Sequence, residues 1–595
     1  MQTVSQAWKD NQKQTLVGES DIEVSIKLTD PDAYEDASAT DNGHVYYSNT
    51  NHTVSDGEKN IKPYATLERN LWLLDGSREI LPTNIYGETG FVSDSISTSS
   101  GSFSPIPIVT VNFPKVNTKL LQGITITWSN YLKEYAVKFT VKAYNGNTVV
   151  ATKTVENNTL VRTTVTMDIV NYDSITIEIN KWSMGLRRAR IDEILIGVNV
   201  IFSKNDIFSY SCSYESDPIS AELPKSEASF SLNNVDKVFN PYNVEGLSKY
   251  LIERQEISVK YGYKLGSSVE WINGGIFYLS EWDAAQGGIG ADFVARDLLE
   301  FMTNTYYKGL YNPNGTSLYD LAEDVLLDAD LPVNADGSVK WVIDNGLKNI
   351  YTIAPLPIDS HANCLQLIAN AGCCVLYQDR AGVLHLKQRL SVSTDTDYDV
   401  SLFNSYSKPD LSLSKPLKQV DVPCYSYSVA TQSSELYKGV MNIKGTVDVL
   451  ITYSGQASNV SATLSGGTLN SATYYTNSCV LNITANGDVT ITIKGYSLES
   501  SSVLISTISS VSGETVSVDN PLITSQDIAI AIGSWVESYM KNRMTLSSDW
   551  RADPRLDALD IVDNENDYGI NKVIMTKVKY SYNGAFRGSG EGRVV

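Results

Sequence analysis

The chain has 595 residues with 47 basic and 68 acidic side chains, which gives a net charge of −21. At about 100–200 residues per domain, this length predicts about three to five domains, each able to close its own core. Hydrophobic residues make up 42% of the chain, and 35 tyrosines and 39 glycines favour β-structure with turns and wet aromatic surfaces. The acidity argues against broad binding to nucleic acid or anionic membranes, because phosphates require a basic face.

Residues able to bind metals or carry out catalysis are few and scattered. Four histidines and six cysteines form no HExxH or CxxC motif, and GxSxG and phosphate-loop motifs are absent. Cys373 and Cys374 lie in an apolar run and are interpreted as small buried hydrophobic residues. The acidic loops at 328–332 and 563–569 lack the ligand order of a calcium loop and are interpreted as solvated turns. The sequence therefore predicts no metal, no cofactor and a reducing compartment.

Neighbouring carboxylates can act as general acid and base, so Asp192 with Glu193, and Asp553 with Asp557, are catalytic candidates. Adjacent strand residues point to opposite faces, which separates Asp192 from Glu193. Asp553 lies in a proline-containing loop with Arg551 and Arg555, where ion pairing explains its presence. We therefore expect no enzymatic activity.

The N-terminal region combines a short helix with one strand. The sequence predicts a helix over 5–14 and, from strict alternation of apolar and polar residues, a half-buried strand over 22–28. We assign 1–34 to the first strand or strands of a larger sheet, and 35–69, rich in Asp, Ser, Asn and Gly, to an exposed linker arm. An apolar signal core and an 18-residue apolar run are both absent, so neither export by that route nor a membrane span is expected.

Residues 70–203 contain short strands at regular spacing with turn signals between them, which predicts a β-sandwich or jelly roll. The runs Phe91–Asp94, Pro107–Phe113, Gly123–Trp128 and Arg190–Ile194 resemble the galactose-binding-like, discoidin-type jelly roll. Many members of that family bind glycans through loop aromatics and arginines, whereas many others serve only as spacers.

A glycan site would need aromatic planes for stacking and guanidinium groups for hydrogen bonding. Five residues of the jelly roll have this chemistry: Trp128, Tyr131, Trp182, Arg187 and Arg188. The alternative places Trp128 in the core and leaves the arginines solvated or facing a partner.

Residues 204–305 predict a barrel-like β-domain, and 306–420 predict a domain of helices and a hairpin. Ser317 is expected to cap a helix whose apolar residues recur at helical spacing. A second helix is expected over 360–371, followed by a hairpin that turns at Gly382.

These regions are similar to the tail-hub family of tailed bacteriophages and related contractile machines, which includes the amino-terminal part of tail-associated lysins. The matching features are Phe239–Asn243, Gly275–Leu279, the helix-and-hairpin domain, and near the C-terminus Trp550–Leu556 followed by Asp560–Val562. The resemblance covers about half the chain in two pieces, about 205–420 and 521–595. We expect these pieces to fold together into one coupling body, with the closing helix and strands in 521–595.

Residues 421–520 between the two pieces are interpreted as an additional β-domain. Strands are expected at 445–453, 478–483 and 488–494, with turns at Gly466-Gly467 and Asn486-Gly487. Together these assignments predict a mainly β fold with a few helices (α+β), in which hub-type β-barrels carry an inserted jelly roll. The ends of such an insertion must lie close together.

The resemblance implies a structural virion protein of the phage tail tip, a baseplate or tail hub, assembled in the bacterial host cytoplasm. In the family the hub is a homotrimer that contacts the distal tail protein, the tape-measure protein, the tail tube and receptor-binding proteins. Tyr306, Tyr307 and Tyr311 suit a subunit interface, although core packing or a plain loop explains them as well. Lysin-type members continue into a hydrolase, whereas this chain ends after the closing strands, so the resemblance implies the scaffold without the enzyme.

The function has alternatives to the structural hub role. The chief alternative is a carbohydrate-binding adhesin of the tail tip that recognises host surface glycans, with the hub-like half as support. A third interpretation is a hydrolase whose site is not recognised in the sequence. The net charge of −21 also suits a passage through which DNA slides without sticking, because like charges repel phosphate.

Overall fold

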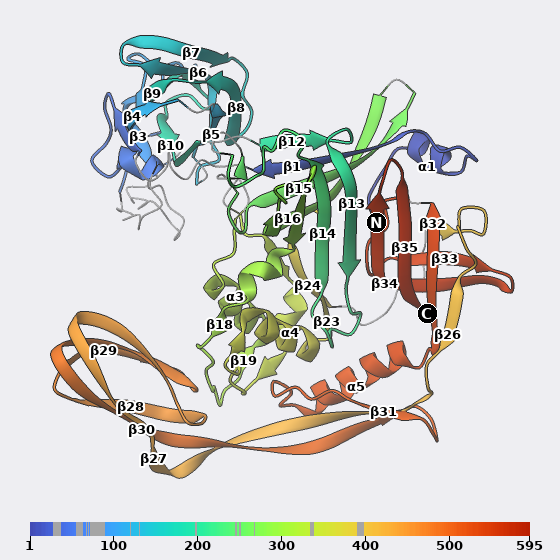
Figure 1. The fold of residues 1–595 in the computed structure, drawn as a ribbon. Coiled ribbons are helices and arrows are strands. Elements are labelled where there is room, and N and C mark those ends of the chain that lie inside the picture. The colour runs from blue at the N-terminus through green and yellow to red at the C-terminus, as the bar shows by residue number, and fades with distance from the viewer. Residues whose placement is uncertain are drawn as a thin grey trace.

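The computed structural model describes the chain from residue 1 to 595 except residues 28–36, 55–63, 67, 70, 72–89, 119–120, 130, 197–198, 244–246, 249–250, 267, 334–337, 389–397 and 552. The expected mainly β, multidomain α+β architecture is confirmed. A central sheet body carries a jelly roll on one side, a small helical region below it, and a long two-stranded ribbon beneath both (Figure 1).

The central body is one sheet built from four separate parts of the chain. Its strand order is β12-β1-β15-β16-β17-β14-β13-β34-β35-β32-β26, with β33 on β34 and β25 on β33. The strands run as follows: β1 (Ser20–Lys27), β12 (Asn199–Ser203), β13 (Ile207–Glu215), β14 (Lys225–Asn233), β15 (Glu256–Leu265), β16 (Ser268–Asp283), β17 (Gly290–Arg296), β25 (Asp399–Val400), β26 (Asp410–Leu413), β32 (Met544–Arg551), β33 (Ile561–Asn566), β34 (Gly569–Tyr582) and β35 (Phe586–Val594).

The junction between the two hub-like pieces is a ladder inside this sheet. Strand β13 pairs antiparallel with β34, so that Cys212 lies opposite Tyr580. Apolar side chains of both pieces, together with Trp8 from helix α1 (Gln6–Gln12), form one core cluster. Residues about 205–420 and 521–595 therefore form a single body.

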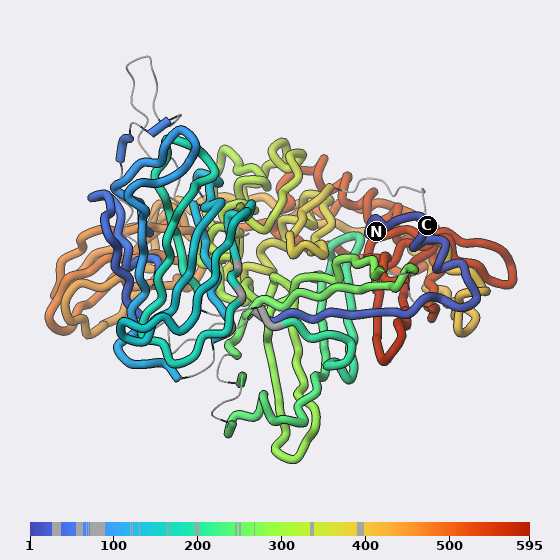
Figure 2. The backbone as a smooth tube through the Cα atoms, turned by 90° about the horizontal axis from the view of Figure 1, so that it is seen from above, coloured from blue at the N-terminus to red at the C-terminus, as the bar shows by residue number. Residues whose placement is uncertain are grey.

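The jelly roll leaves and rejoins this body at neighbouring strands. Strand β1 runs into the jelly roll and β12 returns from it, and the two pair antiparallel with Lys27 opposite Asn199. In the view of Figure 2 the jelly roll stands at the end of the molecule away from both termini. Its ends lie close together, as an insertion requires.

The jelly roll packs a five-stranded sheet, β2-β4-β9-β6-β7, over a three-stranded sheet, β11-β5-β8, with β10 paired to β3. The elements are β2 (Ser38–Asp41), η1 (Thr50–Thr53), β3 (Phe91–Ile96), β4 (Ile108–Asn117), β5 (Leu121–Thr127), β6 (Ala136–Asn145), β7 (Thr148–Val155), β8 (Arg162–Ile169), β9 (Tyr172–Trp182), β10 (Arg188–Ile191) and β11 (Glu193–Ile196). Strand β2 and its buried Ala39 show that the expected exposed arm at 35–69 is wrong for residues 38–54, which pack on the jelly roll.

The helical region follows the predicted order. Ser317 Oγ accepts a hydrogen bond of 3.1 Å from the backbone N–H of Asp320 and so caps α3, and Gly382 turns the hairpin with a φ of 78°. Its elements are η3 (Leu298–Met302), β18 (Thr305–Tyr306), β19 (Thr316–Ser317), α3 (Leu318–Asp328), β20 (Trp341–Ile343), η4 (Asn345–Asn349), β21 (Tyr351–Thr352), β22 (Asp359–Ser360), α4 (His361–Ala371), β23 (Cys374–Gln378) and β24 (Leu384–Gln388).

The region at 421–520 forms a long ribbon rather than a compact separate domain. Strand β27 (Leu417–Thr452) pairs along nearly its whole length with β30 (Ser478–Ile508). The near half packs on α5 (Gln526–Met540) beside β31 (Glu514–Ser517), whereas the far half curls with β28 (Ala457–Ser465) and β29 (Thr468–Tyr474) around its own small core. The turn at Gly466-Gly467 is confirmed, but Asn486-Gly487 lies within β30.

Candidate functional site

The structure places the two candidate tryptophans in the core of the jelly roll. Trp128 is 0% and Trp182 1% exposed, and their rings meet edge to face at 6.0 Å. Each indole N–H has a buried acceptor: Trp128 Nε1 donates to Thr163 Oγ1 at 2.9 Å, and Trp182 Nε1 to Glu134 Oε2 at 2.7 Å. A buried ring offers no plane to a sugar, so the assignment of these two residues to a glycan-binding face is corrected.

Arg187 is buried as well, next to the same carboxylate. It is 5% exposed, and its Nε lies 2.9 Å from Glu134 Oε1. Burial raises the pKa of Glu134, while the hydrogen bond from Trp182 and the charge of Arg187 act in the opposite direction. Glu134 thus binds both Trp182 and Arg187, two of the glycan-site candidates, and holds their side chains in the interior.

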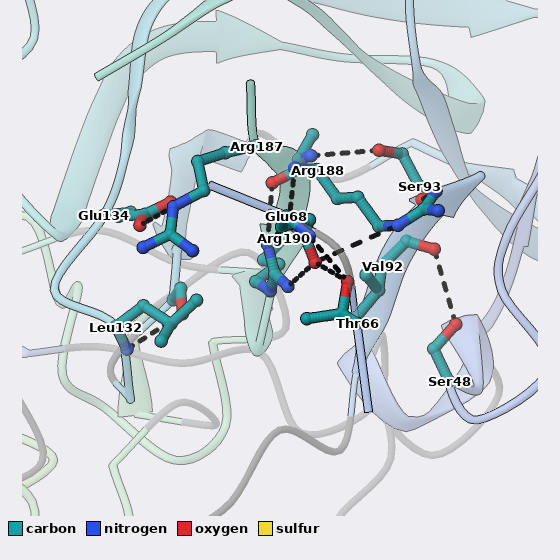
Figure 3. A network of polar contacts seen from close by, with 12 residues as sticks. Ser48, Thr66, Glu68, Val92, Ser93, Leu132, Glu134, Arg187, Arg188 and Arg190 are labelled. Carbon is teal, nitrogen blue, oxygen red and sulfur yellow. Dashed lines mark hydrogen bonds and ion pairs between the residues drawn. The ribbon is translucent and has the colours of Figure 1, made fainter. Parts of the chain in front are cut away.

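Arg188 belongs to a second network, centred on Glu68 (Figure 3). Its backbone N–H donates to Glu68 Oε1 at 2.7 Å, and its Nη1 donates to the carbonyl oxygen of Ser93 at 2.9 Å. The side chain of Arg188 is 19% exposed. A second arginine, Arg190, makes two parallel hydrogen bonds to the Glu68 carboxylate, at 2.8 and 2.7 Å.

The Glu68–Arg190 pair is fully enclosed, with both side chains 0% exposed. Burial alone would raise the pKa of Glu68, but the hydrogen bonds and the charge of Arg190 outweigh it, so the pKa of this carboxyl is lowered. Glu68 was not predicted as a buried residue, because it lies in the segment expected to be an exposed arm. Its partner Arg190 is 122 residues away, and no residue near Glu68 in the chain indicates this pairing.

Tyr131 is half-buried and packs against a small aromatic cluster in which Tyr47 and Tyr64 stack at 3.8 Å. Of the five glycan candidates, only Tyr131 and Arg188 keep partial exposure. The structure therefore does not bring the five together on one surface.

The second region of interest is the junction of the hub body, where Arg380 from the hairpin is held. Arg380 is 4% exposed, and its guanidinium donates to the carbonyl oxygens of Asn273 at 3.0 Å, Pro554 at 2.6 Å and Leu556 at 2.8 Å. Its Nε pairs with Asp557 at 2.5 Å. Arg380 precedes the hairpin glycine Gly382 by two residues, and no local pattern in the sequence marks it as buried.

Tyrosine rings from three strands surround the same guanidinium. Its central carbon lies 5.1 Å from the ring centre of Tyr214, 5.7 Å from Tyr261 and 5.8 Å from Tyr580. Burial would lower the pKa of Arg380, but Asp557 and the tyrosines raise it well above its ordinary value. Arg380 stays charged and fastens the hairpin to both hub-like pieces.

A cleft of about 670 Å³ opens beside this junction and includes three carboxylates. Each is already engaged: Asp557 with Arg380, Asp379 with His385 Nε2 at 2.9 Å, and Asp560 with the terminal amine at 2.9 Å. All three carboxylates of the cleft therefore have a structural partner within the described residues.

The Trp550–Leu556 motif near the C-terminus contains a further buried ion pair, between Asp553 and Arg555. Asp553 accepts from Trp8 Nε1 at 3.0 Å and pairs with Arg555 at 2.7 Å, so the ion-pair interpretation of this residue is confirmed for Arg555. Arg551 instead donates to the carbonyl oxygens of Gln14 and Thr15.

The three candidate interface tyrosines contact other parts of the same chain. Tyr306 is 3% exposed and packs edge to face on His361, so it cannot contact another subunit, and its assignment is corrected. Tyr307 and Tyr311 are half-buried, and their backbones bond to the ribbon: the Tyr307 carbonyl accepts from Ser478 Oγ at 2.7 Å, and the Tyr311 N–H donates to Thr476 Oγ1 at 2.7 Å.

Within the described residues, groups of three or more side chains suited to hold a metal ion are absent. In the same residues, helices of sufficient length and apolarity to cross a membrane are absent too. Cys373 and Cys374 are buried and unpaired, as expected.

Comparison with known proteins finds no matching family model and no matching curated protein. Similar solved structures include the 43 kDa tail protein of prophage MuSo2 from Shewanella oneidensis, with 10% identity over 67% of this chain and 95% of that chain and a TM-score of 0.37. A tail protein from Neisseria meningitidis MC58 matches at 7% identity over 66% of this chain and 93% of its own, with a TM-score of 0.37. The family 32 carbohydrate-binding module of NanJ from C. perfringens, in complex with galactose, matches at 20% identity over 30% of this chain and 100% of its own, with a TM-score of 0.18.

Proposed function

We propose that this chain is a structural virion protein of a bacteriophage tail tip and acts as its baseplate or tail hub. The observation that carries the proposal is the single sheet in which β13 pairs with β34 and both hub-like pieces share one core. A coupling protein must transmit force without coming apart, and a continuous sheet fastened by a buried arginine meets that need. The resemblance of the Trp550–Leu556 motif and the helix-and-hairpin domain to tail hubs supports a phage tail as the assembly to which this chain belongs.

The proposal includes the assembly that the family resemblance implies. The chain would form a homotrimer and join the tail tube and distal tail protein to the receptor-binding proteins, with the tape-measure protein as a further partner. DNA would pass only through the lumen of the ring. We propose no enzymatic role, and each carboxylate of the cleft at the junction has a structural partner in support of this: Arg380, His385 or the terminal amine.

Immunogold electron microscopy of phage particles tests the location. We expect antibodies against this chain to label the tip of the tail, the end away from the capsid. Labelling of the capsid, or particles without label in a lysate that contains the protein, would contradict the proposal. Native mass spectrometry of the purified chain tests the trimer separately.

Carbohydrate-dependent adhesion through the jelly roll remains the second candidate. One observation favours this function: the jelly roll has its own core and is joined to the central sheet body through the two adjacent strands β1 and β12, as an accessory binding domain would be. Binding of the full chain to a glycan array tests it, with saturable, sugar-competed binding as the supporting result. Absence of such binding would leave the jelly roll as a spacer.

A further inference from the structure

A cavity of about 380 Å³ lies between helix α1, the loop after β25 and the end of β32. Its basic lining residues are Lys9, Lys13, Arg551 and Arg555. The acidic lining residues are Asp399 and Asp553, and Asp553 is already paired with Arg555 at 2.7 Å. A concentration of positive charge in a chain whose net charge is −21 needs an explanation.

Arg551 is oriented so that one edge of its guanidinium meets no acceptor within the described residues. Its Nη1 donates to the carbonyl oxygens of Thr15 at 2.8 Å and Gln14 at 3.2 Å, and the group lies 5.1 Å over the ring of Phe403. These contacts fix the plane of the guanidinium. Its Nε and Nη2 are buried, and neither has a hydrogen-bond partner among the described residues.

An unpartnered pair of N–H groups on one guanidinium edge matches the two oxygens of a carboxylate or phosphate. Leaving such donors buried without an acceptor is unfavourable, and more so for charged groups. Arg551 also lies directly opposite Arg587 in the β32–β35 ladder, a like-charge pair that an anion would relieve.

An amide group in the cavity lining also has an unsatisfied atom. Within the described part of the chain, the buried Asn404 Oδ1 has no donor. An oxyanion that still carries a proton, such as hydrogen phosphate, would satisfy this acceptor as well as the Arg551 donors, whereas a carboxylate would satisfy only the donors.

We propose that this cavity is an oxyanion-binding site in which the Nε/Nη2 edge of Arg551 holds two oxygens of the ligand. The ligand class is a phosphate or carboxylate, and the Asn404 acceptor favours hydrogen phosphate. The site is independent of the glycan question, since it lies in the hub body rather than the jelly roll. The proposed site also does not depend on the hub proposal, because a single chain contains all the lining residues and can bind the anion outside a phage tail.

Isothermal titration calorimetry of the full chain tests the site with sodium phosphate and with sodium acetate, each against sodium chloride at equal ionic strength. We expect one phosphate per chain, and loss of affinity by about tenfold or more in Arg551→Gln, because the paired charge-assisted bonds are removed. Binding of acetate as well would assign the site to oxyanions in general. Phosphate heats equal to those of chloride would overturn the proposal.

Arg254→Gln is the matched control. Arg254 also lies over a phenylalanine, 5.0 Å from the ring centre of Phe301, and donates to a carbonyl oxygen, but it is not among the residues that line the cavity. It should leave phosphate binding unchanged. If Arg551→Gln fails to fold, Arg551→Lys keeps the charge without the two-pronged edge, and unchanged phosphate affinity in that variant would equally refute the assignment.

Discussion

Arg190 in the jelly roll and Arg380 in the hub body are both buried arginines that join distant segments, but their acceptors differ. Arg190 is neutralised by one carboxylate, Glu68, which is 0% exposed. Arg380 donates chiefly to backbone carbonyls of two segments and is ringed by tyrosines, with Asp557 at its edge. The jelly roll thus depends on one ionisable partner, whereas the hub junction spreads the charge over groups that do not titrate in the same range.

The largest expected effect is in the jelly roll. Glu68→Gln keeps the shape but leaves Arg190 buried without a counter-charge, so we expect a loss of about 3–5 kcal/mol in unfolding free energy of this part. Denaturant unfolding followed by jelly-roll tryptophan fluorescence measures it. A double variant with Arg190→Met should recover much of the loss, and equal losses in single and double variants would argue against the pair as the cause.

Removing Arg380 should have a smaller effect on stability. In Arg380→Met three carbonyl oxygens and Asp557 lose a donor, but carbonyls can find other partners, so we expect a loss of about 3 kcal/mol. The loss should appear in the hub body and leave the jelly roll unchanged, which limited proteolysis can resolve. Arg254→Met, at a partly exposed site, serves as the control and should change stability by less than about 1 kcal/mol.

Two buried carboxyls, Asp297 in the central sheet body and Glu68 in the jelly roll, should respond to pH in opposite directions. Burial raises the pKa of Asp297, at the end of β17, from 3.8 to about 7. The folded state therefore holds its proton more tightly than the unfolded state, and the contribution of Asp297 to stability should fall as the pH rises from about 4 to about 7, by an amount on the order of 4 kcal/mol. Asp297→Asn should flatten this dependence.

The lowered pKa of Glu68 has the reverse sign. Its stabilising contribution is fully present above its ordinary value of 4.5 and is lost as the pH falls through the lowered folded value. Melting of the two parts between pH 3 and 8 distinguishes them. A jelly roll that loses no stability on acidification, or loses as much in Glu68→Gln, would contradict the assignment.

The smallest predicted effect concerns a helix cap. Ser317→Ala removes the bond from Oγ to the N–H of Asp320 and should cost about 1 kcal/mol. Ser525 precedes α5 without a side-chain capping bond, so Ser525→Ala is the matched control and should be close to neutral. Equal losses in the two variants, measured by urea unfolding, would show that the cap is not the cause.

Local sequence signals predicted the helices and the hairpin well, because their information lies within a few residues. Ser317 and Ser360 each cap a helix three residues before the bonded N–H, and Gly382 turns the hairpin where expected. The long ribbon was harder, since Asn486-Gly487 has the composition of a turn but continues within β30, opposite Lys444 and Ile443.

The candidate site could not be predicted in the same way. Whether Trp182 faces a sugar or the core depends on Glu134, which lies 48 residues away and accepts its indole N–H. The same holds for Arg190 and Glu68, whose pairing arises only when a segment that looks exposed folds back on the jelly roll. Long-range partners of polar side chains are set by the tertiary fold and leave no local pattern.

The antiparallel pairing of β1 with β12 bears on how such molecules diversify. The chain departs at Lys27 and returns at Asn199 on facing rungs of one ladder, so everything between them can be exchanged for a module of any length whose ends are a strand spacing apart. A short turn in its place would leave the registers of β1 with β15 intact. The inserted domain can therefore be replaced during evolution while the central sheet keeps its structure.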